Sequence, residues 1–280
     1  MNVIGIGQAG CAIAEKISEY KQYNVFYIDN ANTKKHKNFL KVKEQPSHEK
    51  YESEYKKLRL NKLPSEQTVL ILCGAGKISG VILRFLEQIK DRDLKILYVK
   101  PDLDLLDNDS RTRERIVFGV LQEYARSNLI KDIAIVSNSA IEAVLDDVSI
   151  VNYWDNINSF VASTFHMLNV FNNTEPLLNT MTEVKEVNKI STFGVASFKD
   201  LDEKVLYPLE SPRLKKYFFG ISEKTLNEEK DLLHRIRDYV KDKSEEKCDA
   251  CFAIYSTEYE QDYVYVSQHA SLVQEQNIDS

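Results

Sequence analysis

Two glycine clusters in this sequence have the residue types and spacing of loops that bind phosphate. The first is Gly5–Gly10 (GIGQAG) and the second is Gly74–Gly80 (GAGKISG). Glycine lets backbone N–H groups approach a ligand that a side chain would obstruct, and a helix starting there adds the positive end of its dipole. The chain has only nine glycines in 280 residues, and most of them lie in these clusters. Two such loops predict one ligand held from two sides, although glycine turns also serve to pack a helix closely on a sheet.

The elements around the first cluster predict a parallel sheet. The apolar run Asn2–Ile6 leads into the glycines, a helical pattern follows, and Val25–Ile28 is a second apolar run that ends at Asp29. Strand, turn, helix and strand form a βαβ unit. The acid at Asp29 also satisfies the dinucleotide-binding fingerprint. The alternative function is therefore an NAD(P)-binding Rossmann oxidoreductase, although no catalytic Tyr-Lys, His or Cys arrangement follows.

The remaining elements predict an α/β fold in three parts. The hydrophobic pattern predicts strands at 68–73, 94–99 and 133–136 and helices at 81–89 and 111–126, followed by a long, largely buried helix over 148–171. Segment 34–66 is predicted to be a solvated loop plus a charged helix without a site. Strands at 191–198, 215–221, 250–256 and 262–270 then surround a helix at 223–241. We predict a parallel-sheet nucleotide-binding domain (1–147), the central helix with its following loop (148–189) and a smaller α+β C-terminal domain (190–280).

Composition and charge exclude several classes of partner. The chain carries 37 basic and 43 acidic residues, a net charge of −6, which offers no general attraction to nucleic acid. No apolar stretch approaches the roughly 18 residues that cross a bilayer, and no signal peptide is evident, so we expect a cytoplasmic protein without membrane contact. Cys248 and Cys251 form a C-x-x-C, but no second ligand pair accompanies them. We interpret them as reduced cysteines and predict no metal site.

The glycine clusters, taken with the motifs that follow them, resemble the FtsZ/tubulin superfamily. Gly5–Cys11 looks like the first phosphate loop of that superfamily, and Gly74–Gly80 aligns with its GGGTGTG signature. The resemblance covers essentially the whole chain, and its specificity lies in the order and spacing of weakened motifs. The shortness of the chain is more like that of phage- or plasmid-encoded members. The resemblance continues through Lys100-Pro101, Asp109, Arg113, Leu177–Asn179, Ile190–Gly194 and Ser211-Pro212.

The resemblance implies a cofactor, a partner and a set of site residues. The cofactor would be GTP or GDP, with Mg²⁺ accompanying it, and the partner would be another copy of the chain in a head-to-tail protofilament. Asn158 (or Asn156) and Asn179 are the candidates for reading a guanine base, although a polar helix entry explains Asn158 equally well. The nucleotide-binding residues implied are Gly7, Gln8, Ala9, Gly10, Cys11, Gly74, Ala75, Gly76, Lys77, Ser79, Gly80, Asp109, Arg113, Asn158 and Asn179.

Departures from the superfamily pattern predict a weakened nucleotide site. In the signature loop, Lys77 either supplies a charge to a phosphate or points into solvent, and Ile78 puts bulk where the family keeps none. No glycine occurs between residues 40 and 66, where relatives contact the terminal phosphate. A protein that keeps the fold but binds neither nucleotide nor itself is a third interpretation.

Departures in a second loop predict that hydrolysis is absent or very slow. The loop that completes hydrolysis in relatives, N-x-D-x-x-D, reads Asn179–Val184 here, without either aspartate. A carboxylate is needed there to polarise the attacking water, and Met181 cannot supply one. Glu183 or Glu186 would have to substitute, and both are more simply read as solvent-facing charges. We therefore assign no catalytic residue.

Overall fold

The computed structural model describes residues 1–30, 37–55, 64, 67–89, 93–145 and 149–275. The predicted segment 34–66 therefore lies partly outside the described residues, as does the predicted domain boundary at 147. The division of the chain into domains stays a prediction.

A parallel sheet forms the first half of the fold. Its strand order is β3-β2-β1-β4-β5-β6, and every neighbouring pair is parallel. The chain builds outward from β1 in both directions, so the order reverses between β1 and β4. In open α/β sheets such a reversal leaves a crevice at the carboxyl ends of the strands, where ligands bind. The strands are β1 (Asn2–Ile6), β2 (Asn24–Asp29), β3 (Phe39–Lys41), β4 (Thr68–Leu72), β5 (Leu94–Lys100) and β6 (Asp132–Ser137).

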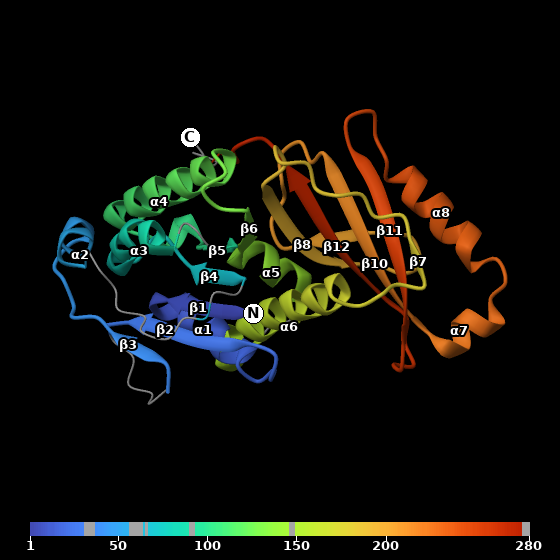
Figure 1. The fold of residues 1–280 in the computed structure, drawn as a ribbon, viewed down its shortest axis with the longest axis horizontal. Helices are drawn as coiled ribbons and strands as arrows, with labels where there is room; N and C mark the ends of the chain where they lie inside the picture. The colour runs from blue at the N-terminus through green and yellow to red at the C-terminus, as the bar shows by residue number, and fades with distance from the viewer. Residues whose placement is uncertain (31–36, 56–63, 65–66, 90–92, 146–148, 276–280) are drawn as a thin grey trace.

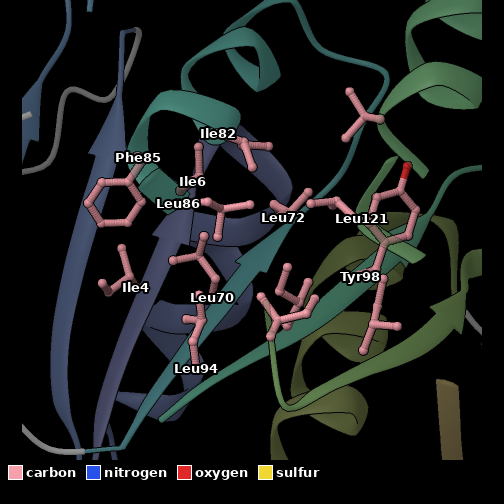
Figure 2. Close-up of a cluster of buried hydrophobic side chains, with 14 of the residues drawn as sticks. Ile4, Ile6, Leu70, Leu72, Ile82, Phe85, Leu86, Leu94, Tyr98 and Leu121 are labelled. Carbon is pink, nitrogen blue, oxygen red and sulfur yellow. The ribbon is translucent and has the colours of Figure 1, made fainter. Parts of the chain in front are cut away.

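Helices cover both faces of this sheet, as a continuously apolar parallel sheet requires. All five residues of β1 and all five of β4 are buried. Figure 1 shows α3 and α4 on one face and α1 and α6 on the other. Figure 2 shows the strand side chains of Ile4 and Leu70 directed toward Phe85 of α3. The helices are α1 (Gly7–Ile17), α2 (His48–Glu54), α3 (Val81–Ile89), α4 (Asn108–Arg126), α5 (Asn138–Leu145) and α6 (Tyr153–Asn172).

The sheet continues into a C-terminal portion with mainly antiparallel pairing. Strand β8 joins β6 through two residue pairs, and the order then runs β8-β12-β10-β11-β7, with β9 pairing β8. Helix α8 packs its apolar face on this portion, as Figure 1 shows. The elements are β7 (Leu178–Asn179), β8 (Ile190–Ala196), β9 (Glu203–Val205), β10 (Leu214–Ser222), α7 (Glu223–Glu228), α8 (Leu232–Asp242), β11 (Asp249–Thr257) and β12 (Tyr263–Ala270).

The predicted elements match this architecture, with two corrections. The single helix predicted over 223–241 is broken into α7 and α8, because Glu229 adopts an extended conformation (ψ 95°) between them. The central helix α6 is buried along only one side: Trp154 is 59% exposed, whereas Phe171 is buried and stacks on Phe218 of β10. The predicted α/β fold with a mainly parallel sheet is confirmed. No helix in the described part of the chain has the length and apolar character needed to span a membrane.

Candidate phosphate-binding site

The two glycine clusters follow β1 and β4, the two strands at the reversal point. Helix α1 starts at Gly7, directly after β1, and Gly7 adopts a left-handed conformation with φ of 70°. Among the described residues no side chain caps the start of α1, and its first turn holds no acid. Its first N–H groups lack helical partners and are suited to an anion. The second cluster follows β4 and enters a short 3₁₀ turn, η1 (Lys77–Gly80).

Four of the six clustered glycines are required by close packing. A Cβ on Gly10 would lie 2.2 Å from the carbonyl oxygen of Ile71, and one on Gly80 would lie 2.1 Å from that of His48. A Cβ on Gly5 would lie 2.5 Å from the carbonyl oxygen of Gly10, and one on Gly74 would lie 2.3 Å from the hydroxyl oxygen of Tyr98. These positions let α1, α2 and α4 approach the sheet and the second loop closely. Helix packing therefore explains much of the glycine pattern.

The remaining two glycines, Gly7 and Gly76, face each other across the side chain of Ile78. The Cγ2 methyl of Ile78 lies 3.0 Å from the position of a Cβ on Gly7 and 3.7 Å from that of a Cβ on Gly76. The rest of the Ile78 side chain packs partly against the core. An apolar methyl group of the second loop therefore lies against the start of α1.

Cationic and hydroxyl groups brace the second loop. Arg113 of α4 donates from Nε to the carbonyl oxygen of Ala75 at 2.9 Å and from Nη2 to Ser110 Oγ at 2.7 Å. Ser79 Oγ donates to the carbonyl oxygen of Gly74 at 2.9 Å. Lys77 is exposed at the start of η1. The structure thus brings Arg113 and Ser79 to the second loop, where their side chains donate hydrogen bonds to carbonyl oxygens of the loop. Lys77 is left in solvent.

Three further predicted residues start or neighbour α1. Gln8 is exposed and Ala9 is half-buried in the first turn. The Cys11 thiol points into the core and donates to the carbonyl oxygens of Gly5, at 3.4 Å, and Ile28, at 3.7 Å. Burial, with the nearby Asp29 carboxylate, raises the pKa of Cys11 to about 12. The Cys11 side chain is therefore engaged within the core.

Asp29 does not have the environment that an NAD ribose site needs. Its side chain is 6% exposed, and one carboxylate oxygen accepts the N–H of Asn30 at 2.8 Å. The carboxylate is therefore engaged in the turn after β2. This geometry does not favour the oxidoreductase alternative.

The residues predicted for base recognition lie apart from one another. Asn158 is half-buried in the second turn of α6, and Asn156 lines a cavity of about 410 Å³ between α1 and α6. Asn179 is on the edge strand β7, and its Oδ1 accepts the N–H of Met181 at 2.7 Å. Asp109, predicted for the ribose and phosphate side, is exposed in the first turn of α4, one turn before Arg113. The role of Asn158 and Asn179 in base recognition stays a prediction.

The sequence interpretation missed helix α2 as a neighbour of the second loop. The carbonyl of His48 abuts Gly80. Tyr51 is 1% exposed, and its hydroxyl oxygen accepts a hydrogen bond from Asn30 Nδ2 at 2.7 Å. Burial lowers the pKa of His48, and the nearby Arg113 lowers it further. The available signal was Ser47, which caps α2 by accepting the N–H of Lys50.

The C-x-x-C cysteines are buried and unpaired in the C-terminal portion. Cys248 and Cys251 are free thiols, and Cys251 Sγ lies 3.6 Å from Met181 Sδ. Across the described ranges no three His, Cys, Asp or Glu side chains gather as they would around a metal ion.

Comparisons with known proteins identify the fold. The sequence matches no protein-family model and no curated protein. The structure resembles a GDP-form protofilament of TubZ from Bacillus thuringiensis serovar israelensis, with a TM-score of 0.68, 15% identity and coverage of 98% of this chain and 87% of that one. It also resembles the GTPγS-bound protofilament of CetZ2 from Haloferax volcanii, with a TM-score of 0.71, 12% identity and coverage of 96% and 92%. An empty FtsZ dimer from M. jannaschii gives a TM-score of 0.65 at 10% identity over 96% and 87% of the chains.

These likenesses extend over nearly the whole of this chain and most of each neighbour. At such low identity they report on the backbone arrangement. The likeness covers the parallel sheet, the central helix α6 and the C-terminal portion together, as parts of one fold. This chain therefore has the FtsZ/tubulin fold.

Proposed function

We propose that this chain is a divergent tubulin-like structural protein that assembles head to tail and binds a guanine nucleotide weakly. The observation that carries the proposal is the full-length FtsZ/tubulin fold, in which both glycine loops keep their places while Ile78 narrows the space between them. The TubZ and CetZ2 structures are protofilaments with GDP or GTPγS. Head-to-tail contacts that do not close produce filaments. Encoding on a phage or plasmid stays a prediction.

The residues present are only partly suited to a nucleotide phosphate. The start of α1 supplies backbone N–H groups and a positive dipole end, and Lys77 and Arg113 supply nearby positive charge. A Mg²⁺ ion would accompany the phosphates and neutralise part of their charge. Against this, the Ile78 methyl has to move before a phosphate can lie between Gly7 and Gly76. Binding is therefore expected to be weak rather than absent.

Hydrolysis is proposed to be impaired. In the loop after α6, Met181 is half-buried against Cys251, while Glu183 and Glu186 are exposed. A water-activating carboxylate must be held within hydrogen-bond reach of the water. Among the described residues, no hydrogen bond or ion pair holds the side chain of either glutamate. Phosphate release from GTP is expected to stay close to the uncatalysed background.

The test is assembly measured across a concentration series. Sedimentation velocity and electron microscopy, with GTP, with GDP and without nucleotide, should show concentration-dependent polymers whose yield depends little on the nucleotide. A monomer at every concentration and in every nucleotide state would refute the structural role. Thermal shift with GTP, GDP and NAD separates the alternatives, because a ligand that binds the native state raises the melting temperature. Stabilisation by NAD alone would favour the oxidoreductase.

A further inference from the structure

A second cavity lies at the opposite end of the strands from the glycine loops. Its volume is about 390 Å³, and it is bounded by the amino ends of β5 and β6, by the end of α6 and by one face of β8, β10 and β12. In Figure 1 this is the region where the parallel sheet meets the C-terminal portion alongside α6. We call it the junction cleft.

Three basic side chains from three strands line the junction cleft. They are Lys95 of β5, Lys216 of β10 and His269 of β12. Lys216 is paired with Ser267 on β12, and His269 is two residues further along that strand, so both strands present these groups on one face. None of the ion pairs found among the described residues involves Lys95 or Lys216.

One acid faces the junction cleft, and it does not balance these charges. Asp132 accepts a hydrogen bond from Ser191 Oγ at 2.9 Å. Burial raises the pKa of Asp132 to about 6, although Lys95 and Lys189 oppose the rise. Glu183 and Cys251 act on Lys216 from outside the cleft. The groups facing the cleft therefore carry a net positive charge at neutral pH.

His269 shows the effect of this unbalanced charge. Its Nε2 lies 3.3 Å from Ser267 Oγ, whereas its Nδ1 is buried without a hydrogen-bond partner among the described residues. Burial, with Lys216 and Lys95, lowers the pKa of His269 to about 3, and burial also lowers that of Lys216. Buried polar and charged groups without partners destabilise a protein. A negatively charged ligand would remove this cost.

We propose that the junction cleft is a binding site for a small organic anion, with a carboxylate or phosphate group between Lys95, Lys216 and His269. The apolar part of the ligand would lie against aromatic side chains on the remaining walls. These are Phe165 of α6, Phe193 of β8 and Phe218 of β10. The site lies at the opposite end of the strands from the glycine loops.

The first test measures binding by calorimetry at constant ionic strength, with inorganic phosphate and hexanoate as probes. Lys216→Gln should weaken binding of either probe at least tenfold, because it removes one of the two ammonium groups. Lys224→Gln, an exposed lysine on α7, is the matched control and should leave binding unchanged. If hexanoate binds more tightly than phosphate, the three phenylalanines contribute to binding of the ligand. If phosphate binds more tightly than hexanoate, the site is selective for a phosphate group. Equal binding by wild type and Lys216→Gln would overturn the proposal.

A second readout localises the anion. The imidazole NMR signals of His269 should titrate at a higher pH when the probe is present, because an anion stabilises the charged imidazole. A phosphate bound at the glycine loops would leave these signals unmoved. Lys216→Gln should also melt at a higher temperature than wild type without probe, because it removes a half-buried ammonium group whose charge burial disfavours. If that variant does not fold, Lys95→Gln replaces it. His269 signals that do not respond to either probe would refute the site.

Discussion

Ile78 is the residue that most directly separates this site from one that would hold a phosphate freely. Its Cγ2 methyl lies 3.0 Å from the position of a Cβ on Gly7 and 3.7 Å from that of a Cβ on Gly76. The sequence shows that the residue is bulky, but only the structure shows that the methyl points between the loops. The weak nucleotide binding that we propose rests on this position of the Ile78 methyl group.

Removing this methyl should strengthen nucleotide binding. Ile78→Ala deletes Cγ2, and we expect the affinity for GDP to rise about tenfold, equivalent to roughly 1.4 kcal/mol. Stability should fall by about 2 kcal/mol, because part of the side chain packs on the core. Titration with a fluorescent GDP analogue measures the affinity. Ile78→Val keeps the Cγ2 methyl and is the control. An equal rise in GDP affinity in Ile78→Val and Ile78→Ala would contradict the steric explanation.

The two kinds of glycine should respond differently to an added methyl group. Gly10→Ala places Cβ 2.2 Å from the Ile71 carbonyl oxygen, and we expect the free energy of unfolding to fall by at least about 2 kcal/mol. Gly76→Ala meets nothing nearer than 3.7 Å and should change stability by no more than about 0.5 kcal/mol. Urea unfolding of both variants measures this. A similar fall in the free energy of unfolding in both variants would show that close packing also excludes a side chain at Gly76.

At the scale of elements, α4 carries a glycine that no contact explains. Gly119 lies in the interior of the 19-residue helix, and a Cβ there would meet nothing within 4 Å. Glycine costs about 1 kcal/mol relative to alanine inside a helix. We expect Gly119→Ala to raise the free energy of unfolding by about 0.5–1 kcal/mol, measured by urea unfolding. A loss of stability would indicate that a partner packs against α4 at this position.

The elements also show which structural features local patterns can predict. Strands β1, β2, β4 and β5 were predictable because both faces are buried and their runs are continuously apolar. The break between α7 and α8 was not, because the sequence pattern stays helical while the chain turns at Glu229. The short helix α2 was recognised only as charged, and its contact with Gly80 depends on a neighbour 32 positions away.

For the whole molecule, buried histidines should make stability depend on pH. Burial lowers the pKa values of His48, His166 and His269 below their ordinary value. The unfolded chain then binds more protons than the native one, so these groups stabilise the fold above pH 6.5 and lose that contribution as the pH falls. Asp132 acts in the opposite sense: its raised pKa, about 6, favours folding at low pH and is lost as pH rises through 6. The pKa shift of His269, from 6.5 to about 3, is larger than that of Asp132, and His48 and His166 act in the same direction as His269.

We therefore expect the urea midpoint to fall between pH 7.5 and 5.5 in a buffer without phosphate. His269→Gln should reduce the slope below pH 6 by up to about 1.4 kcal/mol per pH unit, the value for one proton. Asp132→Asn should steepen the same decline. A midpoint that rises on acidification would show that the histidines are solvated in the native state.

The sequence alone determined the succession of strands and helices and the places where glycine is needed. Both are local properties: apolar periodicity follows from which faces are buried, and a tight strand-to-helix turn excludes side chains within a few residues. The tertiary structure decided which distant groups meet. Ile78 covers Gly7, His48 abuts Gly80, and Lys95, Lys216 and His269 line one cleft. These contacts depend on strand order, register and side-chain direction, which spacing along the chain does not specify.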